Sequence, residues 1–285
     1  MAQFTNQATL TYNGLITNSN IVVGELTEVL NVTKTPLFGT YSRGGTVTYL
    51  VSIVNSGTTE FNGLTLTDNL GEYALESGTK VVPHDYISGS VKYYLNGVLQ
   101  TAPAVTAGPP LVISGISVPA AGNTTVVYEA RVNNLAPLDS EGQITNTVSV
   151  NGEGLINPIT DDATVSATAE PALSITKALC PQTVAENGQL TYTFYIQNTG
   201  NTAIVAADNV TISDTFDPAI DITAVTFNDA AWTPTTDYTY TQATGEFQSA
   251  AGAITVPAAT YTQNPTTGVW TVTPGVSTLT ITGII

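Results

Sequence analysis

TVTYLVSIVNSG at residues 46–57 returns as QLTYTFYIQNTG at residues 189–200, and this pair of segments indicates the fold class of the chain. In both, apolar and polar residues alternate, so every second side chain lies on the same face of an extended strand. Similar alternation, separated by Gly, Pro and Asn turns, recurs along the chain, and no window shows a helical stripe. The pattern predicts an all-β protein made of antiparallel β-sandwiches. Further strands are expected at 64–68, 124–132, 144–150, 210–214 and 276–285.

These stretches belong to an internal repeat. LNVTK at 30–34 returns as LSITK at 173–177, at the same offset of 143 residues that separates the two opening stretches. A third pair, LTLTDNL and VTISDTF, follows in the same order in each half. Three matches in order indicate two copies of one structural unit. We therefore expect two tandem sandwiches.

The closing strand of the repeat determines the expected domain organisation. The first copy closes with QITNTVSVNGEGLI at 143–156, and its match is QFTNQATLTYNGLI at 3–16, ahead of both copies. We expect residues 30–172 to form a complete sandwich and residues 173–285 to form a sandwich that lacks its final strands. Residues 1–29 are expected to be the segment that completes it.

A sandwich without its last hairpin leaves a sheet edge unpaired, and such an edge accepts a strand from another molecule. The connector after residue 26 is too short to carry the segment back across a domain, because a strand rises only about 3.3 Å per residue. We therefore expect head-to-tail polymerisation, in which each copy donates its segment to the next. The alternative is that residues 1–29 cover the first sandwich of their own chain. The expected donor-strand residues are Phe4, Asn6, Ala8, Leu10 and Tyr12.

Composition excludes several classes of function. Six Lys plus Arg against 22 Asp plus Glu give a net charge of −16, which argues against nucleic-acid binding. No stretch approaches the roughly 18 apolar residues that cross a bilayer, and the opening MAQFTNQATL lacks the regions of a secretory signal. The one cysteine, Cys180, is expected to be a small buried residue, and the one histidine, His84, to lie in a loop. We expect no metal and no cofactor.

Strand alternation places several scarce polar residues on inward faces, where an unpaired charge is costly. Three interpretations stay open. Each Lys lies at a strand end and reaches water, or it forms a buried ion pair with Asp, with Asn as a hydrogen-bond partner. In the third, a neutral Lys attacks the Asn carboxamide, Asp relays the protons, and an isopeptide bond forms with loss of ammonia. The inward polar residues are Lys34, Asp68 and Asn146 in the first copy, Lys177 and Asp214 in the second, and Asn6 in the N-terminal segment.

The repeat, with its TK strand, TVTY-type strand, LTLTD strand and closing ITNT strand, resembles the domain-of-unknown-function-11 type of bacterial surface repeats. The placement of Lys, Asp and Asn is similar to that in collagen-adhesin (Cna) type pilin domains. The resemblance covers nearly the whole chain and implies an immunoglobulin-like fold with a surface, stalk or fibre role. The cross-links that it implies are Lys34 to Asn146 within the first copy, with Asp68 as proton shuttle, and Lys177 to Asn6 of another subunit, with Asp214 as shuttle.

The sequence thus predicts a structural subunit of an extracellular filament, a pilus or appendage on a cell or spore surface, whose partner is itself. The alternative is an adhesin or stalk module that binds a ligand through its loops. A glycoside hydrolase needs paired acidic groups across a cleft, and no such pair stands out. We therefore expect no enzymatic activity beyond self-cross-linking.

Overall fold

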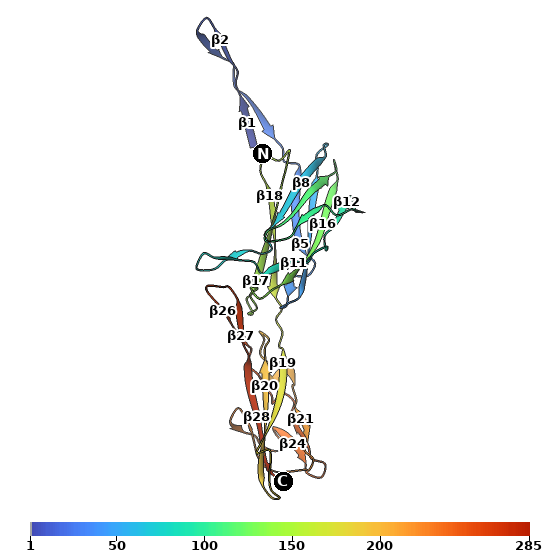
Figure 1. The fold of residues 1–285 in the computed structure, drawn as a ribbon, viewed down its shortest axis with the longest axis vertical. Helices are drawn as coiled ribbons and strands as arrows, with labels where there is room; N and C mark the ends of the chain where they lie inside the picture. Colours follow the sequence, from blue (N-terminus) through green and yellow to red (C-terminus); the bar gives the residue numbers. More distant parts are fainter. Residues whose placement is uncertain (1) are drawn as a thin grey trace.

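The computed structural model describes residues 2–285; Met1, the first residue of the expected donor segment, lies outside the described residues. The molecule is elongated, with a hairpin at one end followed by two sandwiches in line (Figure 1). Within the described residues, the regular structure is β-strand apart from one 3₁₀ turn, η1 (Ala206–Asp208). Across residues 2–285, no helix has the length and apolar character needed to cross a bilayer. The prediction of an all-β protein with two tandem immunoglobulin-like sandwiches is confirmed.

The first sandwich consists of two six-stranded sheets that face each other. One sheet contains, in spatial order, β13 (Val98–Gln100), β12 (Lys92–Leu95), β16 (Asn123–Val132), β7 (Thr46–Asn55) and β5 (Leu30–Pro36), with β11 (His84–Tyr86) beside β16. The other contains β14 (Ala104–Thr106), β15 (Leu111–Val118), β8 (Phe61–Asp68), β17 (Gln143–Asn151), β18 (Ile159–Ala167) and β6 (Thr40–Tyr41). A two-stranded ribbon joins β9 (Tyr73–Ala74) to β10 (Lys80–Val81).

The alternation in the opening stretch is confirmed by burial. Val47, Tyr49, Val51 and Ile53 of β7 are all buried, while the residues between them are exposed or half-buried. They pack with the inward residues of β8, β15 and β17 into one core. This core is the main source of stability of the first sandwich, because apolar burial is the dominant favourable contribution to folding.

The second sandwich repeats this arrangement with fewer strands. Its larger sheet contains β19 (Leu173–Cys180), β20 (Gln189–Asn198), β28 (Gly275–Ile284), β22 (Asp221–Phe227) and β23 (Ala230–Ala231). The smaller sheet contains β21 (Ser213–Thr215), β25 (Glu246–Ser249) and β24 (Tyr238–Thr241), and a separate hairpin joins β26 (Thr260–Gln263) to β27 (Trp270–Thr273).

The strand expected at 210–214 is wrong in its bounds, since β21 begins only at Ser213. Residues 209–212 have no regular structure; they follow the 3₁₀ turn η1, and Asn209 takes the left-handed conformation at φ 53°. The strand pattern of VTISD therefore continues only at its end. This shortens the strand that faces the open side of the second sandwich.

A buried asparagine marks the equivalence of the two sandwiches. The Asn55 side-chain amide donates to the carbonyl oxygens of Thr59 and Pro119, at 2.8 and 3.0 Å. In the second sandwich, Asn198 donates to two loop carbonyls at 2.7 and 3.1 Å. Asn55 pairs with the first residue of β5, and Asn198 pairs with the first residue of β19. The repeat that the sequence predicts is therefore present at the level of single hydrogen bonds.

The N-terminal segment forms one long antiparallel hairpin. β1 (Ala2–Asn6) pairs with β4 (Val22–Leu26), and β2 (Thr9–Tyr12) pairs with β3 (Leu15–Asn18). The turn is Asn13-Gly14, with φ of 49° and 78°, which suits a two-residue hairpin loop. Among the described strands, these four pair only with one another, and the hairpin projects away from the first sandwich (Figure 1). The alternative in which this segment covers the first sandwich of its own chain is wrong.

The β26–β27 hairpin of the second sandwich makes hydrogen bonds to the first sandwich. The Gln263 side-chain amide donates to the Tyr73 hydroxyl at 2.6 Å, and the backbone N–H of Trp270 donates to the Asn134 carbonyl at 3.1 Å. Both acceptors belong to the first sandwich. A hairpin of the second sandwich thus lies against the first and limits how the two can bend relative to each other.

Candidate cross-linking and donor-strand sites

The centre of the first sandwich holds a buried ion pair. Lys34 is in β5 and Asp68 ends β8, so the pair joins the two facing sheets. The Lys34 Nζ lies 2.5 Å from Asp68 Oδ2, and both side chains are 0% exposed. Asp68 Oδ1 also accepts a hydrogen bond from the backbone N–H of Leu70 at 2.9 Å. A buried ammonium is tolerated here because a carboxylate faces it directly.

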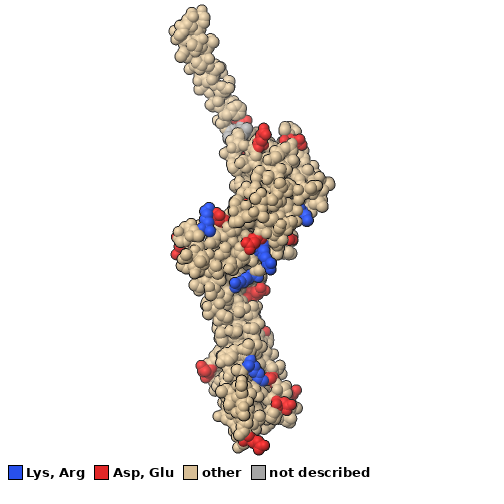
Figure 2. Space-filling model, in the orientation of Figure 1, with Lys and Arg blue, Asp and Glu red and all other residues tan. Residues whose placement is uncertain are grey.

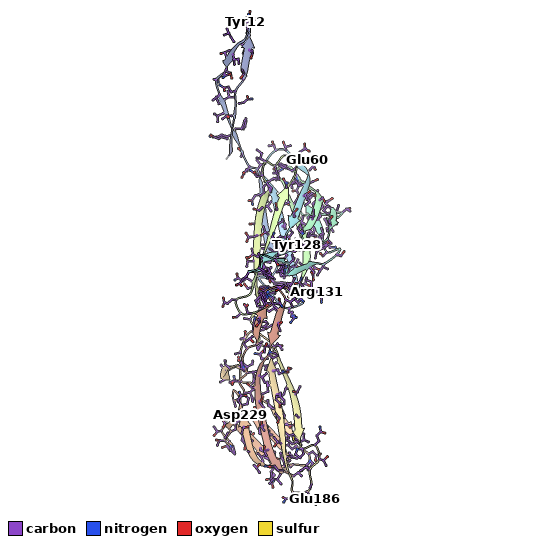
Figure 3. The ribbon with its side chains drawn as sticks, turned by 60° about the vertical axis from the view of Figure 1, so that its left-hand side comes forward. Tyr12, Glu60, Tyr128, Arg131, Glu186 and Asp229 are labelled. Carbon is purple, nitrogen blue, oxygen red and sulfur yellow. The ribbon has the colours of Figure 1, made fainter. Side chains whose placement is uncertain are left out.

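Asn146 lies beside this pair and is linked to it through a tyrosine. The Tyr128 hydroxyl donates to Asp68 Oδ2, and the Asn146 amide donates to the Tyr128 hydroxyl at 3.3 Å. The Asn146 carbonyl oxygen accepts from the backbone N–H of Gly71 at 3.1 Å. Figure 3 labels Tyr128 inside the first sandwich. The structure therefore brings Lys34, Asp68 and Asn146 into one hydrogen-bonded cluster, as the alternation predicts.

Burial changes the acidity of the amine in this cluster. It lowers the pKa of Lys34 to about 8, against the opposing attraction of Asp68. An amine with a pKa near 8 has a sizeable neutral fraction near neutral pH, and the neutral form is the nucleophile. The backbone N–H of Gly71 donates a hydrogen bond to the Asn146 carbonyl oxygen and thereby polarises that carbonyl. The cluster therefore holds an amine, a carboxylate and an amide together in one hydrogen-bonded group.

His84 is a member of this region that the sequence analysis missed. It was expected in a loop, but it lies in β11, is buried, and stacks edge-on against Tyr49 with ring centroids 5.8 Å apart. Within residues 2–285, neither of its ring nitrogens has a hydrogen-bond partner. Burial lowers its pKa to about 4, with Asp68 raising it and Lys34 lowering it. A single histidine after a proline carries no periodic signal, so its position could not be found from sequence.

Two tyrosines of the cluster were also missed as site residues. The Tyr49 and Tyr128 rings are stacked with centroids 5.6 Å apart, and the Lys34 ammonium lies 4.7 Å from the centre of the Tyr49 ring. Burial raises the pKa of both tyrosines, so both remain protonated. The recurrence of the dipeptide Thr-Tyr at the same place in both repeats is the signal that could have identified Tyr49.

The second sandwich contains a partial version of the same site. Lys177 pairs with Asp214, and its ammonium lies 4.4 to 5.3 Å from the ring centres of Tyr192, Phe194 and Phe216. The Lys177 side chain points toward the aromatic rings of its sandwich, but it is 37% exposed and therefore not buried. Its one side-chain hydrogen bond among the described residues is to Asp214.

The second site is open on the side that β17 and β18, the last two strands of the first sandwich, cover in the first site. In the first sandwich, β8 is paired with β15 on one side and β17 on the other, and β18 packs against β5. In the second sandwich, β21 is paired only with β25 among the described strands, and nothing covers β19. Leu30 and Val32 of β5 are buried, whereas their counterparts Leu173 and Ile175 are 42% and 53% exposed. The slot between β21 and β19 is therefore open in the described chain.

The N-terminal hairpin has the register of the two strands that would fill such a slot. In the β17–β18 pair, Asn146 lies opposite Ala163, and in the β1–β4 pair, Asn6 lies opposite Val22. The predicted donor residues alternate onto one face, and their side chains are exposed. From residue 2 to residue 24 the hairpin has no charged side chain, and in Figure 2 it is uncharged up to its base. Asn6 does not contact Lys177 of its own chain, because the hairpin projects from the opposite end of the molecule (Figure 1).

Cys180 differs from its expected environment. It was expected to be a buried small residue, but it is an exposed free thiol at the end of β19. β19 is exposed along nearly its whole length, and Cys180 is exposed with it, because none of the other described strands packs over β19.

Comparisons with known proteins identify similar solved structures only. No family model matches the chain, and no curated protein matches it. The major pilin subunit of Bacillus cereus is 10% identical over 96% of this chain and 73% of that one, with a TM-score of 0.37. The full-length major pilin SpaD from Corynebacterium diphtheriae is 11% identical over 86% of this chain and 59% of that one, with a TM-score of 0.36. The collagen adhesin from S. aureus is 12% identical over 53% of this chain, with a TM-score of 0.32. The chain spans 55% of that adhesin, and thus, as with SpaD, less than two thirds of its length.

Proposed function

We propose that this protein is the subunit of an extracellular filament that polymerises head-to-tail on a cell or spore surface. In this filament, the N-terminal hairpin of one copy fills the open slot in the second sandwich of the next. The observation that carries the proposal is the contrast between β5 and β19. The two strands share their sequence pattern and their pairing register, yet one is buried by β18 and the other is exposed.

The direction of the hairpin supports a linear assembly. In the first sandwich, the turn between β17 and β18 (152–158) lies at the pole near Phe61 and Leu30. The equivalent pole of the second sandwich begins at Leu173 and faces the first sandwich of the same chain. A donated hairpin would therefore enter at the far pole, near Glu186, with its tip pointing toward the first sandwich (Figure 3). The hairpin of each copy projects along the long axis, away from its own second sandwich. A copy placed in line at the far pole would therefore point its hairpin into the slot of the accepting copy.

Apolar burial supplies the driving force. Phe4 and Leu10 are 60% and 65% exposed on the hairpin, and the slot exposes Leu173 and Ile175. Burying such a side chain stabilises an interface by about 1.5 to 3 kcal/mol. New backbone hydrogen bonds along β21 would add specificity of register. The contact joins different surfaces of the two partners, so it propagates instead of closing a dimer.

The proposal includes covalent cross-links. The neutral Lys34 amine attacks the side-chain carbonyl carbon of Asn146, a C–N amide bond forms, and the amide nitrogen leaves as ammonia. Asp68 takes the proton from the attacking amine and passes it to the leaving nitrogen. In the second sandwich, Lys177 and Asp214 have the same relation, and the donated hairpin supplies Asn6 of another copy. No external reactant is needed, and the bond between copies makes the filament covalent.

Electron microscopy of the full chain, followed by boiling in denaturant and gel electrophoresis, tests the proposal. Fibres and a ladder of multimers are expected. Fibres that dissociate to monomers on boiling would remove the covalent part alone. Two-domain particles without fibres, at all concentrations, would overturn the proposal.

A second function is favoured by one specific observation. Leu37 and Phe38, in the loop after β5, are 56% and 73% exposed on the first sandwich. Exposed apolar loop residues are typical of binding surfaces, and they support an adhesin or stalk module that binds a ligand. Monomeric particles that bind a ligand and lose binding with Phe38→Ser would favour this alternative over the filament.

A further inference from the structure

The hairpin is longer than the slot requires. In the register given by Asn6 and Asn146, Thr11 corresponds to Asn151, the last residue of β17. Beyond Thr11, the hairpin continues with a further pair, Tyr12 opposite Leu15, and the Asn13-Gly14 turn. Completing a sandwich therefore does not account for the tip.

The tip carries three large apolar side chains. Tyr12, Leu15 and Ile16 are 70%, 74% and 70% exposed, which is more than any other large apolar residue of the hairpin. Figure 3 shows Tyr12 at the far end of the molecule. Tyr12 and Leu15 form a cross-strand pair on one face of the tip, and Ile16, opposite Thr11, lies on the other face. Exposed apolar side chains at the extremity of a strand pair indicate a surface that another molecule covers.

The first sandwich shows where such residues lie when a hairpin is seated. After β17, the turn folds back, and Leu155 and Ile156 line a cavity of about 100 Å³ together with Val29, Leu30 and Phe61. Leu155 and Ile156 match Leu15 and Ile16 in the repeat. The pole of this completed sandwich thus packs Leu155 against its core, while Ile156 borders the cavity and stays 67% exposed.

The equivalent pole of the second sandwich borders a larger cavity. At the repeat offset of 143 residues, the counterparts of Thr27 and Val29 are Glu170 and Ala172, which line a cavity of about 460 Å³. This cavity lies between the two sandwiches of one chain. Its walls include Leu138 of the first sandwich and Tyr261 and Val272 of the β26–β27 hairpin.

We propose that the tip of a donated hairpin, Tyr12, Leu15 and Ile16, seats in this interdomain cavity of the accepting copy. The inference rests on the proposed function, because the hairpin reaches the cavity only when it fills the slot. The straight two-residue turn carries the tip past the pole, whereas the longer turn of the first sandwich folds back. The donor then contacts both sandwiches of its acceptor, and it holds their relative angle together with the β26–β27 hairpin.

The uncharged tip of the hairpin suits the lining of this cavity. Half of the residues that line the cavity are apolar, and Arg43 and Glu170 are its charged groups. An uncharged tip buries no unpaired charge against them. The Tyr12 hydroxyl and the Asn13 carboxamide are polar groups at the turn, and they can pair with the polar atoms of Ser42 or Asn201, which also line the cavity.

Disulfide trapping between copies of the full chain tests the inference. The background carries Cys180→Ser, to remove the native thiol, and Asn6→Ala, to remove the covalent bond between copies. The tip pair is Leu15→Cys with Ala172→Cys. The control pair is Leu15→Cys with Val276→Cys, because Val276 is exposed on β28 at the same level of the second sandwich. A slot pair, Leu10→Cys with Ile212→Cys, reports on donation itself, since its counterparts Val150 and Leu66 face each other in the first sandwich.

Each outcome supports or overturns the inference. Reducible multimers from the tip pair and the slot pair, but not from the control pair, support it. Multimers from the slot pair alone, or equal yields from the tip and control pairs, overturn the seat while donation stands. The absence of multimers from all pairs, together with an absence of fibres, overturns the proposed function and this inference with it.

A second measurement does not depend on cysteine geometry. Leu15→Ser with Ile16→Ser leaves the slot residues intact and is expected to weaken the affinity between copies roughly 100-fold, about tenfold per side chain. The fibres should remain but bend more, because the acceptor loses a brace between its sandwiches. An unchanged affinity and an unchanged persistence length would overturn the seat.

Discussion

Lys34 and Lys177 occupy the same register position in the two sandwiches, opposite Val51 and Phe194, yet one side chain is fully buried and the other is 37% exposed. Both ammonium groups face an aspartate and lie over aromatic rings. The difference comes from β17 and β18, which cover the first site and have no counterpart over the second among the described strands. The two lysines therefore allow the proposal to be tested one site at a time.

The substitution Asn6→Ala is expected to separate assembly from cross-linking. It removes the carboxamide that the proposed bond to Lys177 needs but keeps the apolar face of the hairpin. Fibres should persist in the microscope, while boiling in denaturant should reduce the ladder to monomers. Asn20→Ala, on the return strand of the same hairpin, is the matched control and should keep the ladder. A ladder that survives Asn6→Ala contradicts the assignment of this residue.

The face of the donor strand is tested by Ala8→Lys and Thr9→Lys. Ala8 corresponds to Val148, which is 0% exposed in the first sandwich, so a lysine there would bury an unpaired charge in the slot. Thr9 corresponds to Ser149 and points to the opposite face. Sedimentation and negative-stain imaging should show loss of polymers for Ala8→Lys and polymers for Thr9→Lys. Equal behaviour of the two variants would mean that the hairpin does not bury this face.

The bond within the first sandwich is tested by mass. A Lys34–Asn146 bond makes the intact chain lighter by one ammonia, and Asn146→Ala should abolish this difference. Asp68→Asn should slow its appearance, because the proton shuttle is lost. Lys80→Met is the control, since that lysine lies in an exposed ion pair. A full-length chain of unmodified mass would show that the cluster is only an ion pair. In that case, Lys34→Met should cost about 3 to 5 kcal/mol, because it leaves Asp68 buried and unpaired.

The buried His84 is expected to make the first sandwich sensitive to acid. Its pKa is about 4 in the folded protein and 6.5 when unperturbed, so below pH 6.5 the unfolded chain binds a proton that the folded chain does not. Stability should therefore fall as the pH drops from about 6.5 to about 4, by roughly 3 kcal/mol at about 1.4 kcal/mol per pKa unit.

The comparison for this prediction is His84→Leu. Because His84 is the only histidine, the difference in unfolding free energy between the variant and the native chain isolates this group. Denaturant titrations at several pH values between 4 and 7 measure it. Parallel pH profiles of the two proteins would contradict the prediction.

The repeated asparagines predict matched losses of stability. Asn55 and Asn198 each donate to two loop carbonyls and accept from the backbone N–H of a glycine two residues later, at 2.9 Å in both cases. Replacing either by Ala leaves these buried groups without partners, at a cost of roughly 3 kcal/mol. Thermal unfolding should show a lower midpoint for the first sandwich with Asn55→Ala and for the second with Asn198→Ala. A loss confined to one of the two would contradict their equivalence.

Much of this molecule could be predicted from its alternation and its repeat. Residues such as Tyr49 and Val51 must share a face because a strand has a period of two, and Lys34 and Asp68 were assigned inward for the same reason. The bounds of β21 could not be predicted, since Asn209 leaves the extended region for a local turn that alternation does not report.

Most strands, their faces and the match between Asn6 and Asn146 follow from the sequence, because they depend only on local geometry and on repetition. Which of these faces are covered is known only from the folded structure. It shows His84 beside Tyr49, Tyr128 beside Asp68, the described hairpin strands unpaired with the rest of their own chain, and the slot beside Lys177 open. This is because burial depends on contacts between strands far apart in sequence, and those contacts leave no periodic trace in any one of them.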